Sequence, residues 1–264
     1  MESVASATAR VLLTGNARAK AAKGITAATE WREGKLAFVF EEPLPERPVR
    51  PEKPDLLSPS RMPKRRKAGS PETRFALLHA IAHIEFNAID LAFDMVARFG
   101  KFMPRSFTDD WIAVGAEEAG HFTLLADRLE ALGGAYGDLP AHGGLWDAAE
   151  KTRDDVLARL AIVPLVLEAR GLDVTPVMVE NFRKQGDEPS AAILETIYSE
   201  EVGHVAKGAA WFRHVCCNRG KEPQTAFQAL VRKHFPSGLK PPFNVEARGQ
   251  AGMPPELYRE LAKP

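Results

Sequence analysis

The chain has 264 residues, a formal net charge of zero and two cysteines. Its mean hydropathy of −0.23 argues against an integral membrane protein, and no apolar run approaches the roughly 20 residues that span a bilayer. The adjacent Cys216 and Cys217 cannot form a disulfide framework, so a cytoplasmic protein that binds no membrane is expected. Charge is unevenly spread: residues 1–70 hold 14 Lys and Arg against 8 Asp and Glu, which leaves an acidic excess in the rest.

The first forty residues are expected to contain helical stretches broken near Gly15 and Gly24, and they lack the hydrophobic stretch of a secretory signal. Seven prolines between Pro43 and Pro63 then forbid a helix or a sheet ladder and predict an extended connector. The connector carries a basic cluster that could lie on the protein or extend away from it. This cluster consists of Arg61, Lys64, Arg65, Arg66 and Lys67.

Four long helices are expected next. The first is capped by Ser70 with Pro71 at its first position, and the third is expected to bend at Pro164 and Pro176. The expected bounds are 71–99, 106–133, 147–184 and 187–218, followed by a short helix over 225–234. The chain is therefore predicted to be all-α, with a long crossover between the second and third helices. Its expected parts are an N-terminal helical segment and Pro-rich connector (1–70), a four-helix bundle (71–220) and an irregular C-terminal tail (221–264).

Two Glu-x-x-His strings lie on the second and fourth of these helices, and each has another glutamate 33 residues upstream. The two sets are offset by 83 residues, and they comprise Glu85, Glu118, His121, Glu168, Glu201 and His204. The i, i+3 spacing places carboxylate and imidazole on one helix face. Such a set is the ligand set of a two-metal carboxylate site inside a four-helix bundle. Oxygen-rich ligands with two imidazoles suit two iron ions, and manganese is the alternative.

Helical hairpins would bring these glutamates together. Residues at one level of an antiparallel hairpin lie equally far from the turn. The midpoint of Glu85 and Glu118 is 101.5, that of Glu168 and Glu201 is 184.5, and both fall on expected turns. The same offset also relates Gly120 to Gly203, each directly before a histidine, which indicates either a close helix approach or space near the metals.

Further polar residues accompany the six ligands. Four acidic residues that also obey the repeat could accept the second ring N–H of the ligating histidines, or could simply form a solvated acidic face. These are Asp90, Asp173, Glu117 and Glu200. His79 and His83 form an i, i+4 pair rotated away from Glu85, and they are either structural or part of a substrate-side pocket.

These motifs resemble the ferritin-like superfamily, and one branch of it more closely. The strings His79–Glu85, Glu117–His121, Glu200–His204 and Pro242–Arg248 resemble the bacterial family called domain of unknown function 455. The resemblance covers about residues 1–261 and implies a ferritin-like four-helix bundle with a di-iron site, without naming a substrate. A distant analogy is to the di-iron hydroxylase that modifies an isopentenylated adenosine of tRNA. Within the tail, Asn244 and Arg248 could contact substrate or serve ordinary surface packing.

The leading functional prediction is an oxidoreductase or hydroxylase that uses O₂ to oxidise an organic substrate. It would need an external electron donor or reductase, because the sequence shows no flavin, nicotinamide or iron–sulfur motif. The alternatives are a ferroxidase or iron-handling protein, a tRNA-modifying hydroxylase, and a bundle that keeps metal only for stability. RNA is a possible partner because the basic cluster could contact phosphates.

Overall fold

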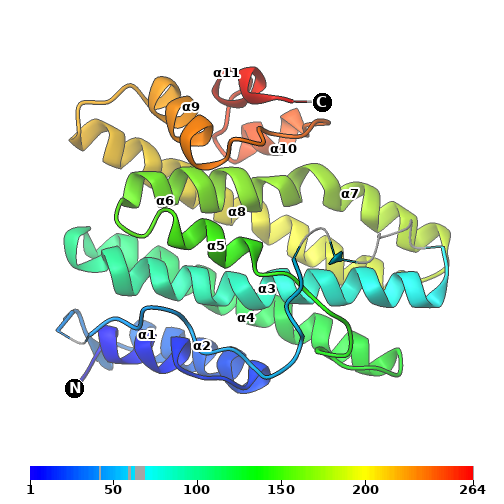
Figure 1. Cartoon of the computed structure of the whole chain (residues 1–264). Coiled ribbons are helices and arrows are strands. Elements are labelled where there is room, and N and C mark those ends of the chain that lie inside the picture. Colours follow the sequence, from blue (N-terminus) through cyan, green and yellow to red (C-terminus); the bar gives the residue numbers. More distant parts are fainter. Residues whose placement is uncertain (42, 59–60, 63–68, 264) are drawn as a thin grey trace. The chain divides into compact units, whose positions relative to one another are not determined.

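The computed structural model describes residues 1–41, 43–58, 61–62 and 69–263. These residues are mostly helical, which confirms the all-α prediction (Figure 1). The strands named among them are β1 (Glu2–Ser3) and β2 (Leu36–Ala37), which pair in parallel. The chain divides into two compact units, Met1–Gly144 and Leu145–Pro264. The division predicted at residues 70 and 220 stays a prediction.

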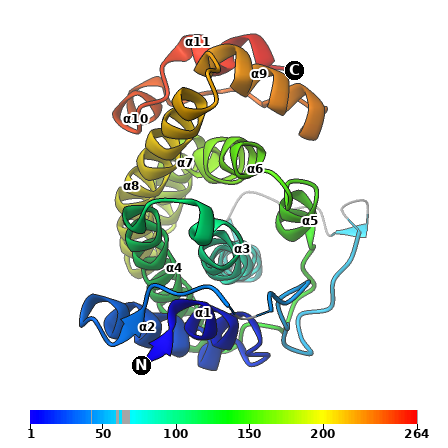
Figure 2. The same ribbon diagram turned by 90° about the vertical axis from the view of Figure 1, so that its left-hand side faces the viewer.

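The first unit is built on a long helical hairpin. Its helices are α1 (Val4–Leu12), α2 (Ala17–Arg32), α3 (Pro71–Phe99) and α4 (Arg105–Ala131), with the short 3-10 helix η2 (Gly100–Phe102) after α3. α3 and α4 pack against each other along the hairpin, α1 covers α3, and α2 lies chiefly on α4 (Figures 1 and 2). The Ser70 hydroxyl accepts from the Thr73 N–H at 3.3 Å, and the Thr73 hydroxyl accepts from the Ser70 N–H at 3.0 Å. This reciprocal cap fixes the start of α3 where it was predicted.

The helical stretch Pro71–Phe102, which comprises α3 and η2, is long and apolar enough to cross a membrane by length and composition, although no apolar run of that length was expected. Its most apolar 18-residue window has a mean hydropathy of 1.3, but 78% of that window is buried inside the protein. That pattern is typical of the core helix of a soluble protein.

The described part of the Pro-rich connector lies against the first unit. The Val49 N–H donates to the Leu12 carbonyl at 2.8 Å, and the Leu57 N–H donates to the Ala141 carbonyl at 2.8 Å. Arg50 reaches α3, where its Nη2 donates to Asn87 Oδ1 at 2.6 Å. Within the basic cluster, residues 64–67 lie outside the described residues.

The second unit contains another long hairpin and the C-terminal tail. The hairpin consists of α7 (Ala169–Lys184) and α8 (Glu188–Asn218), preceded by α5 (Gly144–Glu150), α6 (Val156–Ile162) and the π-helical segment η3 (Val163–Glu168). The tail forms α9 (Pro223–His234), α10 (Val245–Gln250), α11 (Pro255–Tyr258) and the 3-10 helix η4 (Arg259–Leu261). The predicted helix over 225–234 is confirmed as α9.

The prediction of one continuous helix over 147–184 was wrong. The chain leaves the helix after Glu150, re-enters it at Val156, and widens into the π-helical segment at Val163. Pro164 accounts for the widening, because it has no N–H for an i−4 bond and its ring clashes with the carbonyl four residues earlier. The second proline, Pro176, lies inside α7 without ending it.

Candidate metal centre

Three of the predicted ligands meet inside the first unit. His121 Nδ1 lies 3.2 Å from Glu85 Oε2 and 3.5 Å from Glu118 Oε2. The three residues are buried, and each offers one ligand atom within 4.8 Å of those of the others. Two carboxylates and one imidazole therefore converge from α3 and α4, which can hold a metal ion.

Local packing brings the two helices close at this level. Gly115 lies one turn before Glu118, and a Cβ added there would stand 2.6 Å from Phe93 Cε2. A larger residue at position 115 would push α4 away from α3. The 3-10 turn η2 at Gly100–Phe102 falls at the midpoint calculated for Glu85 and Glu118, so the hairpin brings these two residues to one level.

The electrostatics of this cluster favour a cation. Burial lowers the pKa of His121, but its contacts with Glu118 and Glu85 outweigh burial and raise the pKa to about 11. At neutral pH a proton on the imidazole therefore balances part of the buried negative charge. A metal ion would replace that proton, because an imidazole must be deprotonated to bind one.

The second unit carries the second copy of the motif, but its first glutamate lies at the end of a π-helical segment and not inside an α-helix. His204 Nδ1 lies 3.3 Å from Glu201 Oε1, and the His204 side chain is fully buried. Glu168 is half-buried and is the last residue of the π-helical segment. A Cβ added to Gly208 would stand 2.4 Å from Pro164 Cβ, so this glycine lets α8 lie directly against that segment. π-helical segments inside α-helices occur frequently at functional sites.

The two glycines of the motif do not mark a close helix approach. A Cβ added to Gly120 or Gly203 would meet no atom of another described segment within 4 Å, and Gly203 is exposed. Of the two interpretations, a close helix approach is therefore wrong, and space near the metals stays a prediction.

The acidic residues predicted to support the histidines have varied surroundings. Glu117 is half-buried and Glu200 is exposed. Asp90 is buried and forms an ion pair with Lys20, whereas Asp173 is buried and forms one with Arg248. Sequence reasoning missed Lys20, although its place on the apolar Ala17, Ala21 and Ala27 stripe of α2 was a signal for burial. Hydrogen bonds to the ligating histidines stay a prediction.

His79 and His83 help to attach the loop after α4 to α3. His79 Nε2 accepts from the Gly137 N–H at 2.9 Å, and His83 Nδ1 lies 2.8 Å from the Tyr136 hydroxyl. Burial is the main cause that lowers the pKa of His83 to about 3, so this imidazole is neutral. His83 and Tyr136 also line a cavity of about 220 Å³ with Arg50. These contacts account for a structural role, and the substrate-side role stays a prediction.

The comparisons with known proteins identify a family. The family model described as "Protein of unknown function (DUF455)" matches residues 13–259. The chain belongs to the DUF455 family. An uncharacterised protein of Haemophilus influenzae (strain ATCC 51907 / DSM 11121 / KW20 / Rd) is 43% identical over 208 residues, which are 76% of this chain and 72% of that relative. No solved structure matches this chain. Membership in the DUF455 family gives no activity, so function rests on the site.

Proposed function

We propose that this protein binds two metal ions, iron or manganese, through carboxylate and imidazole ligands that both of its hairpins carry. The proposed ligands are the six residues Glu85, Glu118, His121, Glu168, Glu201 and His204. The observation that supports this proposal is the buried convergence of Glu85, Glu118 and His121, together with the matched pair of Glu201 and His204. Carboxylates can bridge two cations, and each imidazole would bind one of them.

We further propose that the protein is an O₂-dependent oxidoreductase. Two bound ferrous ions would supply electrons to dioxygen for the oxidation of an organic substrate. The chain itself would hold the carboxylates in place, exclude water from a buried site, and release the proton of His121 when metal binds. An external electron donor would be needed for repeated turnover.

Anaerobic loading with about two Fe(II) per chain, followed by O₂, tests this proposal. Wild-type protein should consume O₂ and develop the optical absorption of protein-bound ferric iron, whereas Glu118→Ala and Glu201→Ala should not. Glu195→Ala is a matched control, because Glu195 lies exposed on α8. Iron oxidation that depends on no organic compound in a substrate screen would favour the ferroxidase alternative. Absence of any O₂ consumption by the wild-type protein would contradict both.

A further inference from the structure

Two buried ion pairs occupy equivalent positions of the internal repeat. Asp90 lies five residues after Glu85, and Asp173 lies five residues after Glu168. The side chain of Asp90 is 1% exposed and that of Asp173 is fully buried. Their cationic partners, Lys20 of α2 and Arg248 of α10, are buried as well, yet these two residues come from segments outside the repeat. Two unrelated segments thus supply a cation to the same place on each hairpin.

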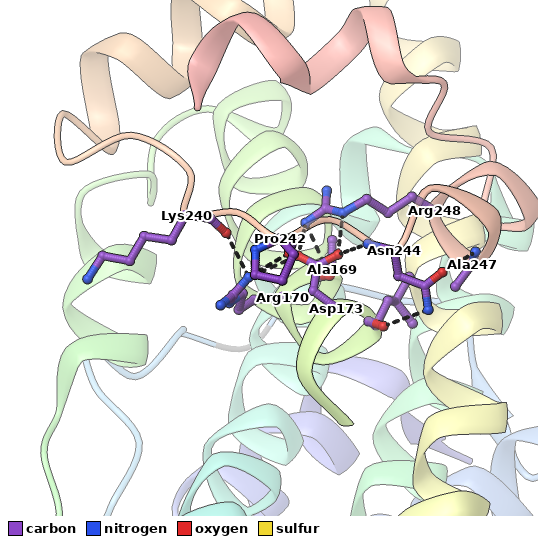
Figure 3. Close-up of polar contacts among 9 residues, drawn as sticks. Ala169, Arg170, Asp173, Lys240, Pro242, Asn244, Ala247 and Arg248 are labelled. Atoms are coloured by element: carbon purple, nitrogen blue, oxygen red, sulfur yellow. Dashed lines mark hydrogen bonds and ion pairs between the residues drawn. The ribbon is translucent and has the colours of Figure 1, made fainter. Parts of the chain in front are cut away.

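Arg248 holds α7 beside the ligand position in the second unit (Figure 3). Its Nε donates to Asp173 Oδ1 at 2.8 Å and its Nη2 donates to Asp173 Oδ2 at 2.7 Å, a two-pronged contact that fixes both groups. The same Nη2 donates to the carbonyl of Ala169 at 3.3 Å, and Ala169 directly follows Glu168. Arg248 therefore contacts the backbone where the π-helical segment passes into α7.

Asn244 extends this contact to α8. Its N–H donates to Asp173 Oδ1 at 2.9 Å, while its Nδ2 donates to the Leu172 carbonyl at 3.2 Å and the Tyr198 hydroxyl at 3.1 Å. Tyr198 lies one turn before Glu201. The tail residues Asn244 and Arg248, which could have contacted substrate, thus bind α7, which begins directly after Glu168, and α8, which carries Glu201 and His204.

Lys20 makes the corresponding connection in the first unit. Its Nζ donates to Asp90 Oδ1 and, at 2.9 Å, to the carbonyl of Val49 in the connector. α2, the connector and α3 are therefore joined at one buried ammonium group.

Stability alone does not explain why a buried ion pair occurs at the equivalent position of both hairpins. A buried ion pair must offset the desolvation of both charges, and replacing such a pair by apolar residues is often neutral or stabilising. An ion pair with hydrogen bonds of defined geometry also fixes the orientation of the helix that carries it. Five residues along a helix correspond to a rotation of about 140° and a rise of about 7.5 Å, so each pair holds the flank of its helix that faces away from the ligand.

We propose that Lys20–Asp90 and Arg248–Asp173 are positioning pairs, which fix the rotation of α3 and α7 and so aim Glu85 and Glu168 at the metal ions. This inference rests on the proposed metal binding. The N-terminal helix α2 and the C-terminal tail then serve the same purpose: α2 fixes the orientation of α3, and the tail fixes the orientation of α7.

Mn²⁺ affinity of the full chain, measured from the electron paramagnetic resonance signal of the free ion, tests this proposal. The double variant Asp173→Leu/Arg248→Met should bind Mn²⁺ about 10–100-fold more weakly than the wild type. Its metal-free unfolding temperature should equal or exceed that of the wild type. For Lys20→Met/Asp90→Leu we expect the same loss of Mn²⁺ affinity and likewise no fall in the metal-free unfolding temperature. The control Arg232→Met/Glu260→Leu removes an exposed ion pair of the second unit and should bind Mn²⁺ as the wild type does.

Arg248→Lys keeps the experiment decisive if a double variant does not fold. A lysine retains the charge but cannot form both contacts with Asp173, so a severalfold loss of Mn²⁺ affinity is expected. Wild-type affinity in a folded double variant, or in Arg248→Lys, would overturn the positioning role alone. Failure of the wild-type protein to bind Mn²⁺ or Fe²⁺ would overturn the metal centre, and the positioning role with it.

Discussion

Glu118→Gln should separate a metal ligand from a structural residue. In the metal-free protein, the buried carboxyl groups of Glu85 and Glu118 both lie beside the protonated His121. Glutamine has the shape of glutamate, and it removes one of the two buried carboxyl groups while it leaves the contact between Glu85 and His121 in place. We therefore expect the metal-free variant to unfold at the wild-type temperature or above it. With metal added, the variant should not show the gain in stability that metal binding gives the wild type.

The size of that gain follows from mass action. Metal at about 100 times its dissociation constant stabilises the folded state by about 2.7 kcal/mol. For a chain of this size, about 2–4 °C per kcal/mol converts this to a rise of about 5–11 °C in the unfolding temperature. We expect that rise in the wild type and in the control Glu130→Gln, which changes an exposed glutamate of the same helix.

Differential scanning calorimetry with and without Mn²⁺ or Fe²⁺ measures both quantities. A Glu118→Gln variant that unfolds several degrees lower without metal, yet keeps the full metal-induced rise, would refute the assignment of Glu118 as a ligand.

Three further predictions concern pH and packing. Because the pKa of His121 is raised to about 11, its contribution to metal-free stability is fully present below about pH 6.5 and is lost as the pH rises towards 11. Urea titrations across this range measure the free energy of unfolding of the wild type and of His121→Gln. If the two free energies changed with pH in the same way, this prediction would be contradicted. For the same reason metal uptake at pH 7 should release a proton, which calorimetric titration in buffers of different ionisation enthalpy detects. Gly208→Ala should lower the free energy of unfolding by about 1–3 kcal/mol, because its Cβ would overlap Pro164. Gly203→Ala should raise the free energy of unfolding by up to about 1 kcal/mol, because alanine favours a helix more than glycine does and the added Cβ has space. Chemical denaturation measures both changes, and equal changes would contradict this account of the two glycines.

Sequence reasoning succeeded where the decisive interactions are local. Ser70 and Pro71 define the start of α3 through contacts within one helical turn, and this start was predicted from the residues themselves. The glutamates of the first hairpin were placed at one level by counting from the turn, because a hairpin with a short turn leaves no other register. The convergence of Glu85, Glu118 and His121 follows from that count.

Contacts between distant segments lay beyond the same reasoning. Lys20 and Asp90 are 70 residues apart, and Asp173 and Arg248 are 75 apart, so no periodic pattern connects them. Both aspartates were predicted as partners of the ligating histidines because they obey the repeat, but their buried cationic partners were not predicted. Pro164 predicted a bend, but its actual effect, a π-helical segment ending at Glu168, depends on how the chain re-enters the α-helix.

We propose above all that the six residues together hold two metal ions. Iron analysis combined with electron paramagnetic resonance of the fully oxidised protein tests it most directly. We predict about two iron ions per chain and almost no ferric signal, because two bridged ferric ions couple their spins. Fewer than about one iron ion per chain, or a full ferric signal from magnetically isolated ions, would contradict a shared centre.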